Sequence, residues 1–291
     1  MLQIVLNIIV LSIVYALIAI SFRVTQGVLR FFNIAHAIVL TLGGYLVYEM
    51  TIQCAWPLSL AVLASILITV LLMLLIDHFL YRPLRLRNAA NWQLMLVSLG
   101  LYVLLQNIVS LIWGDSTLSF RFWEIKEGHM FYGLYINDLE IVTVCSGFLL
   151  LCLFWLFIEK TNVGMKIKAV SSNYELSSIL AISEENAVKW SVGIGTALAT
   201  CAGILIAADT DLSPTLGFNW LLYAIVVIII SGMGKIRHIL LGALLLATFQ
   251  HLVAYYLDSK WMNSVAYIIL IIFLFFCPSG ISRKRIKKVD L

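Results

Sequence analysis

Residues 57–76 read PLSLAVLASILITVLLMLLI, a stretch without a single charged side chain. A membrane-spanning helix needs about 20 consecutive apolar residues, because the hydrocarbon core of a bilayer is about 30 Å thick. This stretch meets that requirement and predicts a helix that crosses a membrane. The whole chain agrees, since its 291 residues are 62% hydrophobic and only 12% charged. A soluble domain of this size carries about twice that share of charged residues.

Eight further charge-poor segments lie on either side of this stretch. The candidate spans are 3–22, 34–53, 57–76, 92–113, 141–158, 189–208, 217–233, 239–257 and 262–280. Two of them are irregular: 34–53 contains His36 and the pair Gly43 and Gly44, and 217–233 is short and follows Pro214. We interpret either one as a possible broken or half-crossing helix. The sequence therefore predicts an all-α, polytopic transmembrane helix bundle of about 8 to 10 spans, forming a single domain over residues 1–291.

The distribution of lysine and arginine predicts the orientation. With nine crossings and a cytoplasmic C-terminus, the inside segments hold 16 of the 19 basic residues, and only Arg121, Lys126 and Lys260 remain outside. Cytoplasmic loops of membrane proteins are enriched in basic residues in this way. Two loops then stand out. Residues 114–140 form a long, acidic and aromatic external loop, and residues 159–188 form a cytoplasmic loop with helical character.

The chain contains no motif for catalysis or for its own energy source. It has no HExxH or GxSxG, and the run from Gly234 to Ile236 lacks both the Ser/Thr and the first glycine of a Walker A motif. Its five cysteines form no CxxC pair, which argues against a metal site. The spans hold almost no ionisable side chains, whereas ion-coupled carriers keep such groups inside the bundle. We therefore expect no enzymatic activity and an energy source outside this chain, although a uniporter or channel could also have a neutral interior.

Four segments, in order, resemble the permease subunits of branched-chain amino-acid ABC importers of the LivH type. They are YALIAI (15–20) with FNIAH (32–36) and TLGGYL (41–46), YRPLR (81–85) with LLQN (104–107), TNVGMKIKAV (161–170) with Ala181-Ile182, and SGMG (231–234) with LGALL (241–245) and PSGI (278–281). YRPLR is the most specific match, and together the segments cover nearly the whole chain. The sequence departs from the family pattern in three places. Ala37-Ile38 follows His36 where the family usually has Gly-Glu. In the coupling region, residues 174–178 replace an E-A-A-like segment and Ala181 replaces a usual glycine. Residues 235–238 lack a proline-glycine turn.

The resemblance implies an importer permease of the bacterial inner membrane, with a cytoplasmic C-terminus, that works by alternating access. Its implied partners are two separate ABC ATPase subunits, a second permease subunit or a copy of itself, an external substrate-binding protein and membrane lipid. ATP and magnesium would be bound by the ATPase chains, with no cofactor, metal or nucleic acid on this one. The implied substrate is a branched-chain or other small neutral amino acid. Urea, short amides and sugars remain alternatives, as does a facilitator that is not coupled to ATP.

Two sets of residues are candidates for function. Polar or small residues at membrane depth predict a substrate pathway, with helix–helix hydrogen bonding or close packing as the alternative: Asn33, His36, Thr41, Gly43, Gly44, Gln106 and Asn107. The resemblance implies that a helix from Ser171 to Ile182 docks into a groove on an ATPase, and lying on the lipid surface is the alternative. The residues assigned to this coupling surface are Gly164, Lys168, Tyr174, Glu175, Leu176 and Ile179.

Overall fold

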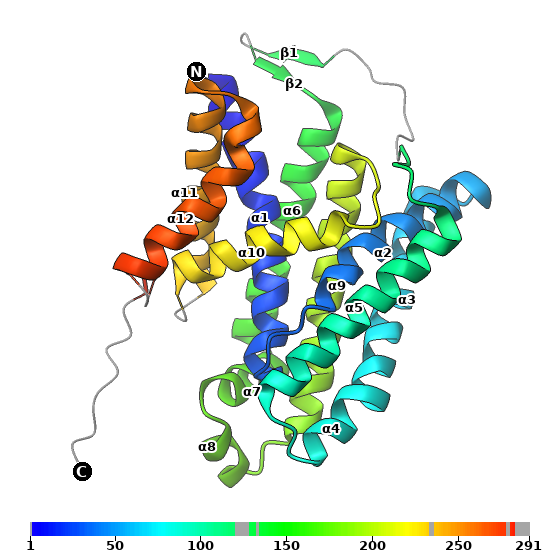
Figure 1. Cartoon of the computed structure of the whole chain (residues 1–291), viewed down its shortest axis with the longest axis vertical. Coiled ribbons are helices and arrows are strands. Elements are labelled where there is room, and N and C mark those ends of the chain that lie inside the picture. The colour runs from blue at the N-terminus through cyan, green and yellow to red at the C-terminus, as the bar shows by residue number, and fades with distance from the viewer. Residues whose placement is uncertain (1, 120–127, 132–133, 233–235, 278–279, 283–291) are drawn as a thin grey trace.

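The fold is that of a computed structural model, which describes residues 2–119, 128–131, 134–232, 236–277 and 280–282 (Figure 1). Its α-helices are α1 (Leu2–Leu29), α2 (His36–Tyr48), α3 (Leu58–Ile76), α4 (Arg82–Leu86), α5 (Asn91–Trp113), α6 (Asp138–Lys160), α7 (Asn162–Ser172), α8 (Tyr174–Ile179), α9 (Glu184–Thr210), α10 (Leu216–Ser231), α11 (Ile236–Tyr256) and α12 (Met262–Phe276). One-turn π-helices, η1 (Glu49–Gln53) and η2 (Asp77–Tyr81), extend α2 and α3, and a 3-10 helix, η3 (Ser259–Trp261), precedes α12.

Seven helices within the described residues are long and apolar enough to cross a membrane: Leu2–Leu29, Leu58–Leu86, Asn91–Trp113, Asp138–Lys160, Glu184–Thr210, Arg237–Tyr256 and Ser259–Phe276. The predicted all-helical, multi-pass bundle is therefore confirmed. The two segments that the sequence marked as irregular are the ones that fall short of this length. Helix α2 ends at Tyr48 and continues only as a π-helical turn, and α10 has 16 residues.

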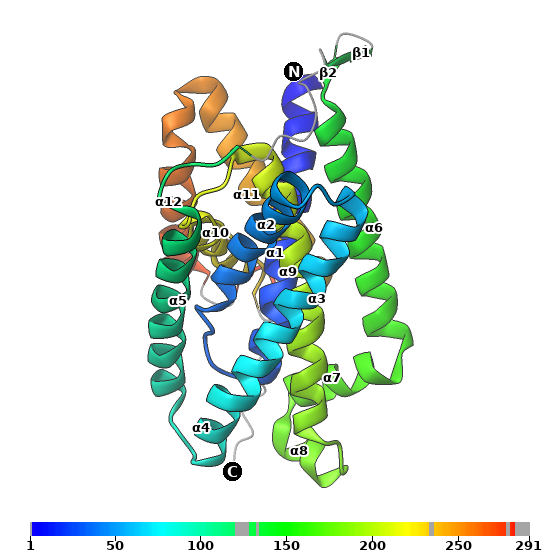
Figure 2. The same ribbon diagram turned by 90° about the vertical axis from the view of Figure 1, so that its right-hand side faces the viewer.

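Helix α9 is at the centre of the bundle, packed against α1, α2 and α3 (Figure 2). Small residues along α9 allow this close approach. A methyl group at Gly195 would lie 2.8 Å from the Ser21 carbonyl oxygen of α1, and one at Gly203 would overlap the Leu40 carbonyl of α2. The stripe of small residues at 195, 199 and 203 is thus a packing surface. The outer helices α5 and α12 bury much less of their length.

Helix α10 lies across the other helices. It runs crosswise to the long axis in Figure 1 and is seen nearly end-on in Figure 2. The first turn of α10 packs on α2, because Gly217 has no side chain to separate it from the Ala37 carbonyl. The backbone N–H of Gly217 donates a hydrogen bond to Thr41 Oγ1 over 3.0 Å. Backbone polar groups at membrane depth need hydrogen-bond partners from the protein, and α2 supplies one to the first turn of α10.

The two motifs of the fourth matching segment, 231–234 and 278–281, meet at the end of α10. The Ile281 N–H donates to the Ile230 carbonyl over 2.8 Å, and the Ser282 N–H donates to the Ser231 carbonyl. Gly280 contacts Gly232 so closely that a methyl group would lie 2.4 Å from its nitrogen. The sequence does not reveal that these two motifs are in contact. Residues 233–235, 278–279 and the basic C-terminal run from Arg283 lie outside the described residues.

The two ends of the bundle differ. Helices α4, α7 and α8 lie at the lower end in Figure 1, and the N-terminus lies at the upper end beside two short strands that the sequence did not predict. Strands β1 (His129–Phe131) and β2 (Leu134–Ile136) pair antiparallel, and the Gln3 side chain exchanges two hydrogen bonds with the Tyr135 backbone. These strands belong to the predicted external loop 114–140, of which residues 120–127, including Arg121 and Lys126, lie outside the described part.

Candidate substrate pathway and coupling surface

The polar residues at the start of α2 are buried and mostly paired. Asn33 is 1% exposed, and its Oδ1 accepts a hydrogen bond from the Tyr81 hydroxyl over 3.0 Å. Thr41 is fully buried and accepts the bond from Gly217 described above. Both side chains therefore join helices to one another. Polar groups at membrane depth commonly find such partners, because an unpaired group in that environment costs free energy.

His36 differs from these two because one ring nitrogen has no partner. The Ser21 hydroxyl donates to the Ile18 carbonyl over 2.8 Å, so its oxygen is left to accept a hydrogen bond from His36 Nε2, 3.1 Å away. That arrangement favours the tautomer with the proton on Nε2. His36 Nδ1 is then a buried acceptor for which the described residues supply no donor. Among the predicted pathway residues of α2, His36 alone keeps a hydrogen-bonding atom free.

Gly43 and Gly44 do not break α2, which runs through both from His36 to Tyr48. The possible break in segment 34–53 therefore does not occur at these glycines. A methyl group at Gly43 would lie 2.9 Å from the Thr200 carbonyl oxygen of α9, and one at Gly44 would lie 2.5 Å from a Leu212 methyl. Both glycines instead let α2 pack closely on its neighbours. The Gly43 carbonyl also accepts a hydrogen bond from the Ser65 hydroxyl over 3.1 Å.

Gln106 and Asn107 lie apart from this group, on α5. Gln106 is half-buried and Asn107 is exposed, and the Asn107 amide donates to the Val103 carbonyl of its own helix over 2.7 Å. Nearby on the same helix, Gly100 has open space where a side chain would be. The structure therefore separates the predicted pathway residues into a buried set around α2 and an outward-facing pair on α5.

A second group of polar contacts, of which one is buried, was not selected from the sequence. The Tyr15 hydroxyl donates to Gln250 Oε1 over 2.7 Å, and the Tyr223 hydroxyl donates to Asn263 Oδ1 over 2.7 Å. The rings of Tyr15 and Tyr223 lie 5.6 Å apart between centroids. These pairs connect α1 and α10 with α11 and α12. The sequence did contain a signal for these contacts, because each of two apolar spans carries an amide side chain, Gln250 in one and Asn263 in the other.

The predicted cytoplasmic loop folds as two helices, α7 and α8, separated at Asn173. A single docking helix from Ser171 to Ile182 was expected, and that expectation is wrong in its boundaries. Asn173 has an extended backbone, and its Oδ1 accepts a hydrogen bond from the Leu176 N–H over 3.1 Å. Asparagine at this position satisfies a free N–H in the first turn of the helix that follows. Helix α8 consequently starts at Tyr174 and ends at Ile179.

Gly164 and Lys168 position α7 against the end of α6. A methyl group at Gly164 would lie 2.5 Å from the Phe157 carbonyl oxygen, and the Gly164 N–H donates to the Thr161 hydroxyl over 3.0 Å. Lys168 forms an ion pair with Glu159. These two residues, which were assigned to the coupling surface, thus make close contacts with α6.

Helix α8 presents an apolar surface with one acidic residue. Leu176 is 56% exposed and Ile179 is 79% exposed, and Glu175 beside them is exposed as well. Tyr174 turns the other way and lies under the Arg30 guanidinium, which is 4.3 Å from the ring centroid. A hydrogen bond from its hydroxyl to Glu184 raises the pKa of Tyr174, because deprotonation would break that bond and place two negative charges together.

A cavity of about 320 Å³ lies beside Tyr174. Its lining includes Val170, Ser177, Ala181, Ile182 and Glu184, from the end of α7 to the start of α9. Helix α8 borders this cavity, so one side of the helix is not tightly packed against protein. No group of three or more metal-binding side chains occurs among the residues that the structure describes.

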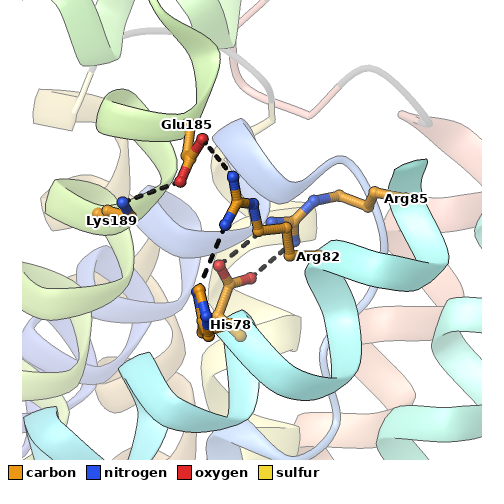
Figure 3. Close-up of polar contacts among 6 residues, drawn as sticks. His78, Arg82, Arg85, Glu185 and Lys189 are labelled. Carbon is orange, nitrogen blue, oxygen red and sulfur yellow. Dashed lines mark hydrogen bonds and ion pairs between the residues drawn. The ribbon is translucent and has the colours of Figure 1, made fainter.

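The YRPLR segment sits at the same end of the bundle and contributes its two arginines to an ionic cluster (Figure 3). Arg82 pairs with Glu185 of α9 over 2.8 Å, and Glu185 also pairs with Lys189 over 2.9 Å. Arg85 holds both oxygens of Asp77, at 2.7 and 3.1 Å. With His78, these residues are called the Arg82 cluster below. Pro83 has no N–H to donate to the preceding turn, and the π-helical turn η2 precedes it.

Comparison with known proteins agrees with this arrangement. A family model described as "Branched-chain amino acid transport system / permease component" matches residues 4–275. The chain is 28% identical to the high-affinity branched-chain amino acid transport system permease protein LivH of Salmonella typhimurium, over 99% of this chain and 97% of the relative. It is 29% identical to the corresponding protein BraD of Pseudomonas aeruginosa, over 94% of both chains.

One solved structure shares the fold. PsaBC from Streptococcus pneumoniae in complex with Fab aligns with a TM-score of 0.55 and 13% identity, covering 95% of this chain and 93% of that chain. The helical bundle and the matched segments define a multi-pass membrane permease. The chain belongs to the family of permease components of branched-chain amino acid transport systems.

Proposed function

We propose that this chain is the membrane-spanning permease subunit of an ATP-driven importer for branched-chain or other small neutral amino acids. Family membership over residues 4–275 is the observation that carries the proposal. The LivH and BraD relatives, whose names specify high-affinity branched-chain amino acid transport, support the substrate class.

The energy source in this proposal is a pair of separate ATPase subunits, which bind the ATP and the magnesium. The chain offers a surface of suitable chemistry for them, since α8 exposes Leu176 and Ile179 next to Glu175 at the end of the bundle that also carries α4 and α7. An exposed apolar helical surface with one charge is typical of docking into a partner's groove. Displacement of α7 and α8 by the ATPases would drive alternating access.

The rest of the proposed assembly follows from the two ends of the molecule. A second permease subunit, a paralogue or a copy of this chain, would share the membrane, and an external binding protein would deliver substrate to the end carrying β1 and β2. Acidic residues near that end, Asp115, Asp138 and Glu140, favour a binding protein with a basic contact surface. The proposed location is the bacterial inner membrane with the C-terminus in the cytoplasm, in agreement with the basic residues at the opposite end.

Uptake by cells tests the proposed function. Cells that rely on this permease should lose uptake of labelled leucine when the gene for the partner ATPase is deleted and recover it when the gene is restored. A competition panel with valine, isoleucine, urea and a hexose then defines the substrate. Uptake that persists without any ATPase would support a facilitator instead, and competition by urea or the hexose alone would replace the substrate class.

Charge reversal at Glu175 tests the docking surface on α8. We expect Glu175→Lys to reduce substrate uptake and stimulated ATP hydrolysis by about tenfold, because it changes the sign of the exposed charge beside the apolar contact residues. Lys260→Glu is the matched control, since it reverses an exposed charge in the short segment between α11 and α12. If Glu175→Lys transports like the wild type, this surface of α8 does not contact the ATPase.

A further inference from the structure

The segment that joins α1 to α2, residues 30–35, is called the link below. It contacts the cytoplasmic end of the bundle on two sides. Arg30 lies over the Tyr174 ring of α8. On the other side, Asn33 accepts the hydrogen bond from Tyr81, and the Phe31 ring packs against the Tyr81 ring with centroids 5.1 Å apart. Beyond the link, the chain continues directly into His36 and the buried start of α2.

A second chain of contacts runs from α8 to the same link. Tyr174 and Glu184, which lies at the start of α9, line the same cavity, and the next residue, Glu185, pairs with Arg82. Arg82 directly follows Tyr81, whose hydroxyl binds Asn33 in the link. Arg85 and Asp77 close a bidentate ion pair across η2, which holds Tyr81 and Arg82 in a fixed orientation. Figure 3 shows Arg82 placed between the two elements, with Glu185 on one side and His78 on the other.

The link is a fixed but unusual piece of backbone. Arg30 has a φ of 63°, in the left-handed region that is costly for a residue with a side chain. The Ile34 N–H donates to the Ser98 hydroxyl of α5 over 3.0 Å. The link is thus held between α8, η2 and α5. The link contacts α8 through Arg30 and continues into α2, so it joins these two helices.

We propose that the link is the element through which α8 moves α2, and that Tyr81, Arg82, Tyr174 and Glu185 are positioning residues that make α8, α9 and the link move together. The proposal rests on the function proposed above, in which ATPase subunits act on α8. It assigns a role in transport to YRPLR, whose side chains reach Asn33, Glu185 and Asp77. The start of α2 that would move carries His36 and Thr41, two of the predicted pathway residues.

The test measures substrate uptake and ATP hydrolysis in the same proteoliposomes, containing the permease with its ATPase subunits and leucine-loaded binding protein. The variants are Arg82→Gln, Glu185→Gln and the double substitution. We expect each single variant to lower the number of leucines imported per ATP by about tenfold, with no further loss in the double variant, because each substitution removes the same Arg82–Glu185 ion pair. Arg87→Gln is the matched control, since Arg87 is exposed and forms no ion pair within the described residues.

Substitutions on α8 test the other contact without touching the Arg82 cluster. Tyr174→Phe keeps the ring under Arg30 and removes the hydroxyl, whereas Tyr174→Leu removes both contacts. We expect Tyr174→Leu to lower leucine imported per ATP more than Tyr174→Phe does. A purely structural role would instead lower the melting temperature and the yield of assembled complex while the ratio of leucine to ATP stays constant.

These experiments distinguish failure of the proposed role of the link from failure of the proposed function. A wild-type ratio in every assembled variant would overturn the proposed role of the link, as would a loss that follows the yield of complex. The absence of ATP-dependent uptake by the wild-type complex would overturn the proposed function itself.

Discussion

At the scale of single residues, Ala181 has a backbone conformation that normally favours glycine. The Ile182 N–H donates to the Ser177 carbonyl and the Ala181 N–H donates to the Ser178 carbonyl, which is the hydrogen-bond pattern of a helix end that requires a left-handed residue. Ala181 has a φ of 55°. Glycine adopts this conformation without the clash that a β-carbon brings. The sequence marked this position as one where the family usually has glycine, and the structure supplies the reason.

We therefore predict that Ala181→Gly stabilises the end of α8 by about 1 kcal/mol, which corresponds to about fivefold slower local opening. Hydrogen exchange of the amides of residues 180–182 measures this. The control is Ala169→Gly inside α7, where the same substitution should speed local exchange because glycine weakens a helix interior. Faster exchange at 180–182 in Ala181→Gly would show that the strained conformation is not adopted.

The identity of the candidate residues could be predicted from the sequence, but their partners could not. Polarity in an apolar segment is a local signal, and it correctly selected Asn33, His36 and Thr41 as buried polar residues. Whether such a residue is paired depends on distant positions, such as Tyr81 for Asn33 and Gly217 for Thr41. The pairing of Tyr15 with Gln250 was missed for the same reason, because 235 positions separate the two residues.

At the scale of elements, the spacing between helices depends on glycines that face backbone atoms. We predict that Gly203→Ala destabilises the bundle by about 3 kcal/mol, because its methyl group would overlap the Leu40 carbonyl and force α2 away from α9. Thermal unfolding in detergent measures the loss. Gly100→Ala on α5 is the matched control, since nothing lies within 4 Å of its added methyl group. If both variants unfold at the wild-type temperature, α2 and α9 are not in this close contact.

The elements themselves follow from the sequence to different degrees. The seven long helices are predictable because each contains a charge-poor run of sufficient length. Helix α10 and the break at Asn173 are harder to predict. The direction of α10 depends on the contact of Gly217 with α2, and the division between α7 and α8 depends on one capping side chain. Apolar length alone shows neither of these.

At the scale of the whole molecule, the distribution of basic residues predicts which end faces the cytoplasm. We expect Cys54, an exposed residue between η1 and α3, to react with a membrane-impermeant maleimide in intact spheroplasts when the other four cysteines are serine. A cysteine placed at Ser183, between α8 and α9, should react only in inverted vesicles. The reverse pattern would place α8 outside the cell, where no ATPase could reach it.

In the proposed function, this permease moves the substrate and a separate ATPase supplies the energy. Proteoliposomes that contain the permease, its ATPase subunits and an external binding protein test this most directly. With active ATPase subunits, we predict that labelled leucine accumulates inside the vesicles above its external concentration. With ATPase subunits that bind but do not hydrolyse ATP, no accumulation should occur. Equal uptake in both preparations would show that ATP hydrolysis by the partner subunits does not drive transport.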